Sequence, residues 1–295
     1  MRRTYFLPAF LSVAVAALLL PASPASAGLL APESGGSPNA DRIASLYWII
    51  FAIALVVFIV VEGALIYSLV KFRKRKDGVA EQIRGNTKLE IGWTLGAAVI
   101  LVALAAVTFV KLDGIRTPEN SGANGLDLAD GVIASSTGPG SELRLPPNGR
   151  SLNICVNGQQ YVWRYTYDQP DCTKNDFKAV YSYEELVVPT DTTVTLDITA
   201  QDVAHSWWVP KLGGKFDAVP GYVNHTWFKI PASKAGTVFT GNCAELCGRG
   251  HANMTARVKA LRPAEYTAWL AKQKAAIAAA NKGAETGRKK FDPTS

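Results

Sequence analysis

Residues 43–70 read IASLYWIIFAIALVVFIVVEGALIYSLV, an apolar run in which the polar interruptions are two serines and one glutamate. At 1.5 Å per residue, a helix of this length exceeds the roughly 30 Å hydrocarbon core of a bilayer. A second apolar run covers residues 91–110, and residues 71–88 between the two carry seven basic and two acidic side chains. This arrangement predicts a two-helix transmembrane hairpin whose loop faces the cytoplasm.

The first 27 residues have the three parts of a secretory signal peptide. These are Arg2 and Arg3, an apolar stretch from Leu11 to Leu20, and the small-residue cleavage pattern Ala25-Ser26-Ala27. A short anchor that stays attached is the alternative. Export of the N-terminus agrees with a cytoplasmic loop. Both ends of the mature chain are therefore expected outside a bacterial plasma membrane that the chain spans twice.

Between about Arg150 and Leu261, short β-type runs such as 160-QYVWRYTY-167 and 193-TVTLDIT-199 alternate with turn residues. Several show the period-two alternation of half-buried strands. About seven such strands predict an all-β sandwich or small barrel. The Ala- and Lys-rich segment from Pro263 to Asn281 predicts a short C-terminal helix.

The expected organisation is thus a transmembrane helix hairpin followed by an all-β domain. Its segments are the signal peptide (1–27), a flexible leader (28–42), helix one (43–70), a cytoplasmic loop (71–89), helix two (90–110), a linker (111–149), an extracytoplasmic β-domain (150–261), and a C-terminal helix and tail (262–295). The net charge of +7 does not indicate nucleic-acid binding, because the basic excess lies in the signal peptide, the loop and the tail.

The stretch 241-GNCAELCGRGHANM-254 places Cys243, Cys247, His251 and Met254 close together, and His205 lies upstream in 205-HSWWVP-210. Two thiols, two imidazoles and one thioether favour a soft or borderline metal, above all copper. One histidine followed by a Cys-His-Met loop is the ligand set of a mononuclear blue-copper site. The additional thiol of Cys243 allows two cysteines to bridge two copper ions. Each ion would then have one histidine, with Met254 and a backbone carbonyl as weak ligands.

Other uses of these residues stay open. A structural zinc site of two cysteines and two histidines explains four ligands but leaves Met254 unexplained. A disulfide between Cys243 and Cys247 is strained unless the loop is locally helical. The third histidine, His225, lies in an aromatic-rich strand and is expected to be a surface or packing residue.

The loop resembles the CuA loop of cytochrome c oxidase subunit II. That family's pattern C-x-E-x-C-x3-H-x2-M is matched at the following positions: Cys243, Glu245, Cys247, His251 and Met254. The family's H-S-[FW]-x-V-P segment is matched from His205 to Pro210, and its K-x-D-A-[IV]-P-G segment from Lys215 to Gly221. The resemblance covers nearly the whole chain. It implies that the β-domain is a cupredoxin with a binuclear CuA centre.

The resemblance also implies roles for single residues. The copper ligands would be His205, Cys243, Cys247, His251, Met254 and the carbonyl of Glu245. The Glu245 carboxylate would bind a magnesium ion shared with the catalytic subunit. Glu90, in 90-EIGWT-94, matches an acid at the mouth of a proton channel; an acid that stabilises a helix N-terminus is the alternative.

Electron input is expected at one of two aromatic residues. Tyr161 stands where the family has a tryptophan that accepts the electron from cytochrome c, and Trp163 follows two residues later. Two residues along a strand keep the same face, so either could lie near the copper. The alternative is that both are packing aromatics.

The resemblance implies a subunit of a terminal oxidase that is an enzyme only as part of its complex. Electrons would pass from cytochrome c to copper, and then to haem in catalytic subunit I, where oxygen is reduced with proton translocation. The implied partners are cytochrome c, subunit I, the other oxidase subunits and the membrane. A cluster of acids from Asp168 to Glu185 would steer a basic donor.

Two other functions stay open: a standalone membrane-anchored cupredoxin electron carrier, and a copper storage or delivery protein. A further expectation concerns the remaining cysteines. Cys155 and Cys172 flank the aromatic strand in a compartment that permits oxidation, and we expect them to form a disulfide.

Overall fold

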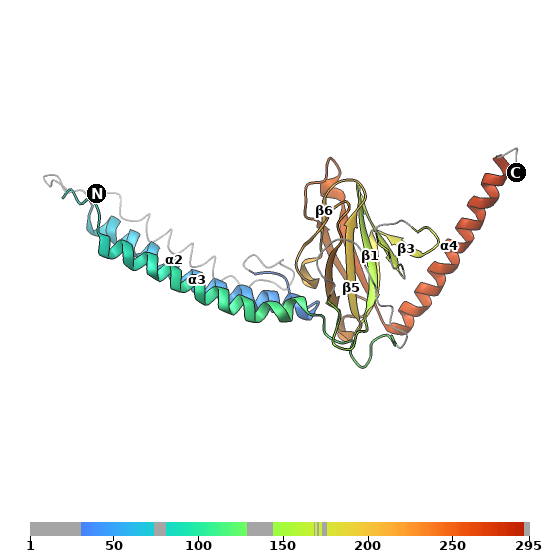
Figure 1. Ribbon diagram of the computed structural model, residues 1–295, viewed down its shortest axis with the longest axis horizontal. Coiled ribbons are helices and arrows are strands. Elements are labelled where there is room, and N and C mark those ends of the chain that lie inside the picture. Colours follow the sequence, from blue (N-terminus) through green and yellow to red (C-terminus); the bar gives the residue numbers. More distant parts are fainter. Residues whose placement is uncertain are drawn as a thin grey trace, which may run out of the picture.

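The computed structural model describes residues 31–73, 81–128, 144–167, 169, 171–172 and 176–291. The predicted signal peptide lies outside these residues. A helical hairpin and a long C-terminal helix extend from a central β-sandwich (Figure 1).

The hairpin consists of α2 (Pro38–Lys71) and α3 (Thr87–Arg116), which run side by side (Figure 1). Each helix is long and apolar enough to cross a membrane, and its most apolar 18-residue window has no buried residue. Burial in α2 is confined to its first turns, at Asn39, Ala40 and Ala44. So much exposed apolar surface requires lipid or a partner helix to cover it.

The prediction that the leader stays flexible up to residue 42 is wrong, because α2 already begins at Pro38. Proline is favoured in a first helical turn because it has no N–H to satisfy and its φ is already helical. Contacts with the sandwich also order this segment. The Ser37 hydroxyl accepts a hydrogen bond from Lys229 N at 3.2 Å, and Asn39 Nδ2 donates to the Trp227 carbonyl at 2.7 Å.

The second helix also continues past its predicted end, and the chain after it is fastened to the sandwich. The Trp227 indole donates to the Ile115 carbonyl at 2.9 Å. Further on, Gly122 N donates to the Asp191 carbonyl at 2.8 Å and Leu126 N to the Thr192 hydroxyl at 2.8 Å. The described part of the predicted linker is therefore held against the domain by its backbone.

The sandwich has two five-stranded sheets. The first has the order β3-β2-β1-β5-β8 and the second β4-β10-β9-β6-β7. The first sheet comprises β1 (Leu152–Gln159), β2 (Val162–Tyr167), β3 (Val180–Tyr183), β5 (Thr193–Ala200) and β8 (Asn224–Lys229). The second comprises β4 (Glu185–Pro189), β6 (His205–Trp208), β7 (Phe216–Ala218), β9 (Val238–Cys243) and β10 (Thr255–Leu261). Three short 3-10 helices lie in the connections: η1 (Pro210–Leu212), η2 (Ala232–Lys234) and η3 (His251–Asn253).

The core lies between the sheets. Strands β9 and β10 alternate exposed and buried residues, as expected where one face packs inward and the other meets water. Strands β1 and β5 pair in parallel at the centre of the first sheet and are buried on both faces. Their outer face is a ladder of small polar side chains that bond to one another, such as Thr195 Oγ1 to Asn153 Oδ1 at 3.0 Å.

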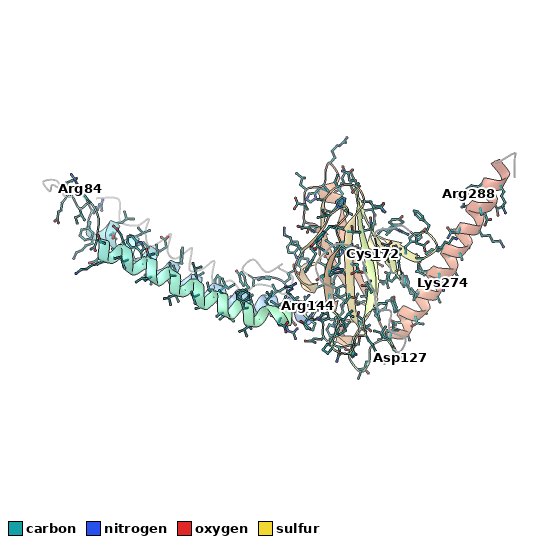
Figure 2. The ribbon with its side chains drawn as sticks, viewed as in Figure 1. Arg84, Asp127, Arg144, Cys172, Lys274 and Arg288 are labelled. Atoms are coloured by element: carbon teal, nitrogen blue, oxygen red, sulfur yellow. A yellow bond between two sulfur atoms is a disulfide. The ribbon has the colours of Figure 1, made fainter. Side chains whose placement is uncertain are left out.

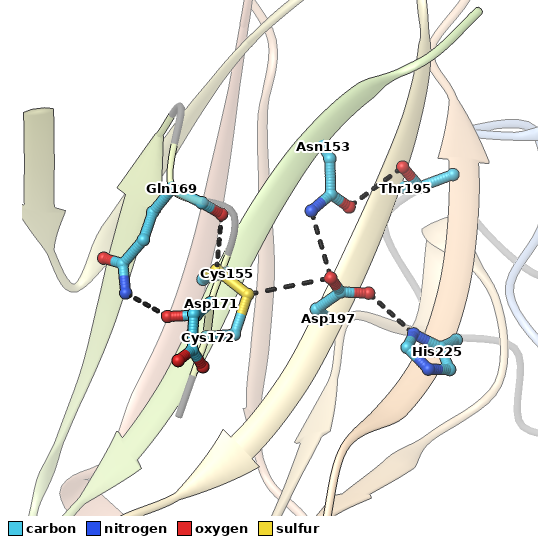
Figure 3. Close-up of a disulfide and its surroundings, with 8 residues drawn as sticks. All are labelled: Asn153, Cys155, Gln169, Asp171, Cys172, Thr195, Asp197 and His225. Atoms are coloured by element: carbon cyan, nitrogen blue, oxygen red, sulfur yellow. Dashed lines mark hydrogen bonds and ion pairs between the residues drawn. A yellow bond between two sulfur atoms is a disulfide. The ribbon is translucent and has the colours of Figure 1, made fainter. Parts of the chain in front are cut away.

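Cys155 and Cys172 form a disulfide on this outer face, as predicted (Figure 3). It fastens the segment after β2 to the central strand β1, and both cysteines are buried. Cys172 Sγ lies 3.6 Å from Asp197 Oδ2. The other oxygen of Asp197 is 2.6 Å from His225 Nδ1, so the third histidine serves this network and not the metal loop.

The C-terminal helix α4 (Pro263–Phe291) is longer than predicted and projects away from the sandwich (Figure 1). Its first half packs on the domain through Tyr266, Trp269 and Leu270, with Gln273 Nε2 donating to the Tyr181 carbonyl at 2.8 Å. Alanine and lysine favour helix without tertiary support, which explains the extension past Asn281. Lys274 and Arg288 mark its path in Figure 2.

Candidate metal centre

The predicted metal loop joins two neighbouring strands. Cys243 ends β9, the 3-10 helix η3 begins at His251, and Met254 immediately precedes β10. Cys243 N donates to the Met254 carbonyl at 2.9 Å, which closes the loop at its base. Strand β6, which begins at His205, pairs with β9 so that Trp207 lies opposite Cys243. The sheet thus brings the distant histidine beside the first cysteine.

The donor atoms form a chain. Cys243 Sγ is 3.9 Å from His205 Nδ1 and 3.9 Å from Cys247 Sγ. Cys247 Sγ is in turn 3.7 Å from His251 Nδ1 and 3.9 Å from Met254 Sδ. At the other end, Cys243 Sγ is 3.2 Å from the Glu245 carbonyl oxygen. The predicted ligands are therefore all brought together.

These distances suit transition-metal ions. Metal bonds of about 2.3 Å to sulfur and about 2.0 Å to nitrogen allow one ion to touch two donors up to roughly 4.3 Å apart. This series of donor atoms divides into two halves that share both sulfurs. One half has His205 and the Glu245 carbonyl, and the other has His251 and Met254. Among the described residues, the donor atoms that lie within 4.8 Å of one another belong to His205, Cys243 and Cys247. His251 stands outside that group, which disfavours a single tetrahedral zinc.

Both thiols are buried and free. Burial raises the pKa of the Cys243 thiol, but hydrogen bonds with His205 and nearby backbone groups outweigh it and lower the pKa to about 6. Burial and the charge of Cys243 raise the pKa of Cys247 to about 11. Because neighbouring thiolates repel each other, keeping both charged requires a cation between them.

The residues around the His205 ring are closely packed. A side-chain carbon on Gly158 would lie 2.9 Å from the His205 ring, so only glycine leaves room for the ligand. Trp163 packs against the same ring edge-on, with centroids 5.8 Å apart. On its far side, His205 Nε2 is 2.9 Å from Asp202 Oδ1, which leaves Nδ1 facing Cys243. An outer carboxylate of this kind fixes the orientation of a ligating histidine.

The structure separates the two aromatic candidates for electron input. Trp163 is fully buried, whereas Tyr161 is 38% exposed. The expectation that they share a strand face is wrong, because Tyr161 lies in the turn before β2 and the alternation begins only at Val162. The ring of Tyr161 lies directly against Gly250, where any side-chain carbon would collide with it. The exposed aromatic thus rests on the ligand loop itself.

The other predicted residues lie outside this cluster. The side chain of Glu245 is exposed. Glu90 is in the first turn of α3, which begins at the end of the hairpin remote from the sandwich, the end where Figure 2 labels Arg84. There Glu90 Oε1 accepts a hydrogen bond from Asn86 N at 3.3 Å while Asn86 Oδ1 accepts one from Leu89 N at 3.1 Å. This reciprocal cap is a structural use of Glu90.

The acidic cluster expected near the aromatic run is partly neutralised. Glu185 pairs with Arg257 at 3.6 Å and with Lys259 at 4.0 Å on the neighbouring strand β10. Asp168 lies outside the described residues. Nearer the metal loop the structure adds two residues that the sequence did not indicate, Asp202 and Gln160. Asp202 lies three residues before His205 and Gln160 directly before Tyr161, but neither was among the predicted site residues.

Comparison with known proteins gives this arrangement a family. Residues 152–261 match the family described as cytochrome C oxidase subunit II, periplasmic domain. Residues 24–110 match cytochrome C oxidase subunit II, transmembrane domain. Together these matches cover the sandwich and both helices of the hairpin. The chain belongs to the cytochrome c oxidase subunit II family.

Two relatives compared by sequence agree with this assignment. Cytochrome c oxidase subunit 2 of Cereibacter sphaeroides is 30% identical over 81% of this chain and 80% of its own length. The protein of the same name from Alkalihalophilus pseudofirmus is 32% identical over 79% of this chain, but the match spans only 59% of that relative. The solved periplasmic domain of cytochrome oxidase subunit II from Bradyrhizobium japonicum is 29% identical. It covers 43% of this chain and 95% of that domain, with a TM-score of 0.37.

Proposed function

We propose that this family member holds a binuclear copper centre between His205, Cys243, Cys247 and His251, and passes electrons through it. The observation that carries this proposal is the chain of donor atoms, in which two sulfurs 3.9 Å apart each have their own histidine. Met254 and the Glu245 carbonyl stand at opposite ends as weak ligands. Thiolate, thioether and imidazole donors together suit copper.

When bound, a copper pair would supply a one-electron redox couple at this site. The chain's own residues hold the donor atoms in place. Cys243, Cys247 and Met254 are each no more than 5% exposed, so the donors are held away from water. The contact with the Asp202 carboxylate favours the His205 tautomer with its proton on Nε2, which leaves Nδ1 for the metal. A rigid, dry site with preset ligands suits electron transfer rather than copper delivery, which needs an exchangeable site.

Electron input from a cytochrome c is proposed at Tyr161. Its exposed ring and its contact with the Gly248–Gly250 segment favour it over the fully buried Trp163. Tyr161→Ala is expected to slow reduction of the copper by ferrous cytochrome c about tenfold or more, an effect of the size seen when a supporting residue is lost. Stopped-flow absorbance measures the rate, and Tyr181→Ala, at an aromatic residue on β3 outside the ligand loop, is the matched control. Equal rates for wild type and Tyr161→Ala would exclude this input site.

Finer parts of the proposal concern the assembled oxidase. The copper would pass electrons to haem in catalytic subunit I, with Glu90 at a proton-channel mouth. The exposed Glu245 carboxylate would contribute to a magnesium site completed by that subunit. The basic loop supports a cytoplasmic hairpin end, with the termini and the copper domain outside. A standalone cupredoxin carrier is the second candidate, favoured only if the chain purifies from membranes without haem-bearing subunits.

The deciding experiment is electron paramagnetic resonance of the detergent-solubilised full chain loaded with copper. An electron shared by two copper nuclei gives more, and more closely spaced, hyperfine lines than an electron on one. We expect the shared pattern, with two coppers bound per chain by metal analysis. One copper per chain with a mononuclear pattern would refute the binuclear centre.

A further inference from the structure

Gln160 lies in the two-residue turn that joins β1 to β2, next to the exposed Tyr161. Its side chain and its backbone bond to two different parts of the metal centre. The side-chain Nε2 donates to the Cys247 carbonyl at 2.7 Å. The backbone N donates to Asp202 Oδ2, also at 2.7 Å.

Through these two bonds the turn is tied to a ligand from each half of the site. Asp202 uses its other oxygen to hold His205 Nε2 at 2.9 Å, so the Gln160 backbone is linked to the first half. Its side chain holds the backbone of Cys247 in the second half. His205 begins β6, and Cys247 lies in the loop between β9 and β10. These strands belong to the second sheet, so the turn fastens the first sheet to the ligand loop of the second.

We propose that Gln160 is a positioning residue for the copper loop: its amide sets the place of Cys247 relative to His205 and couples the electron-input turn to the centre. Tyr161 is bonded covalently to Gln160. One hydrogen bond therefore completes a path from the exposed ring to the backbone of Cys247. This inference rests on the proposed function, since it assigns a role within the same copper site.

The neighbouring Gln159 provides a matched control. It has the same side chain one position earlier, but its Nε2 bonds to Gln201 Oε1 at 3.1 Å and to Asn157 Oδ1 at 3.4 Å. Neither partner is a candidate ligand. A loss specific to position 160 therefore cannot come merely from removing a glutamine amide at this end of the β1–β2 hairpin.

The test uses the full chain in detergent, loaded with copper(II), as wild type and as Gln159→Ala, Gln160→Ala and Gln160→Glu. The glutamate variant keeps the size of the side chain but removes its N–H donor. Loss of an outer hydrogen-bond partner typically lowers metal affinity 10- to 100-fold. We expect a loss of roughly that size for both Gln160 variants in competition with a chelator. Their hyperfine pattern should change and reduction by ferrous cytochrome c should slow, while Gln159→Ala matches wild type.

The unfolding midpoint of the copper-free chain separates positioning from folding. A positioning role leaves that midpoint unchanged in Gln160→Glu while copper affinity and hyperfine pattern change. If both Gln160 variants keep wild-type affinity, spectrum and reduction rate, the inference is wrong although the copper centre stands. If wild type and Gln159→Ala themselves bind no copper pair, the proposed function fails first.

Discussion

The four cysteines form two pairs with opposite chemistry in one sandwich. Cys155 and Cys172 are 17 residues apart and joined as a disulfide on the outer face of the first sheet. Cys243 and Cys247 are four residues apart and free, with sulfurs 3.9 Å from each other, at the end of β9 and in the loop that follows it. All four are buried, so burial alone does not decide which pair is oxidised.

The difference lies in what surrounds each pair. The joined pair sits among hydrogen-bonded polar groups, where Asp197 already has Asn153 and His225 as partners. The free pair has an imidazole nitrogen within 4 Å of each sulfur, and both nitrogens face the thiols. A disulfide closes a long loop and acts through the unfolded chain. Two thiolates a few residues apart gain little from such closure but form a chelate for a metal.

The largest expected effect comes from breaking the free pair. In Cys247→Ser the hydroxyl that replaces the thiol is a hard, weakly ionising donor, and the bridge between the two halves is lost. We expect loss of the shared hyperfine pattern and of electron acceptance. Copper affinity should fall by more than the roughly 100-fold typical of outer-shell changes.

Metal analysis and paramagnetic resonance of the full chain measure this effect, and circular dichroism provides the control for folding. Because serine is nearly the same size as cysteine, the sandwich should stay intact. A Cys247→Ser chain that retains two coppers and the shared pattern would show that Cys247 is not a bridging ligand.

Breaking the joined pair should have the opposite outcome. Replacing both Cys155 and Cys172 with alanine frees the 17-residue loop in the unfolded state and is expected to cost about 3 kcal/mol of unfolding free energy. Chemical denaturation of the copper-free chain measures it. At temperatures where the variant is folded, its copper spectrum should match wild type. A changed hyperfine pattern would mean that the two cysteine pairs are coupled.

Local sequence pattern was sufficient for the hairpin, the sandwich and the ligand loop, because each follows from hydropathy or from residues a few positions apart. Local pattern did not predict features that depend on contacts between residues far apart in the sequence. The start of α2 depends on Ser37 and Asn39 bonding to β8, almost two hundred residues later. Gln160 and Asp202 matter only because the fold brings the β1–β2 turn against the ligand loop.

The choice between Tyr161 and Trp163 shows the same limit on a smaller scale. The two-residue alternation of side chains predicts which residues share a strand face, but it does not show where the strand begins. The turn includes Tyr161, so one aromatic is exposed while the other is fully buried. The disulfide was predictable as a pairing, since two of four cysteines were already assigned to the metal loop. Its contact with the buried Asp197 was not.

The smallest effect tests the surroundings of the joined pair. Asn153 Nδ2 donates to Asp197 Oδ2 at 3.1 Å, and its Oδ1 accepts from Thr195 Oγ1 at 3.0 Å (Figure 3). Asn153→Ala leaves both buried partners short of one bond, which is expected to cost about 2 kcal/mol. Thermal unfolding should show a lower midpoint with unchanged copper affinity.

The Gln160→Glu variant should show the reverse, a wild-type midpoint with weakened copper binding. Each amide would then serve its own cysteine pair, one for stability and one for the metal; a shared loss in both variants would mean that the sandwich responds as a single unit.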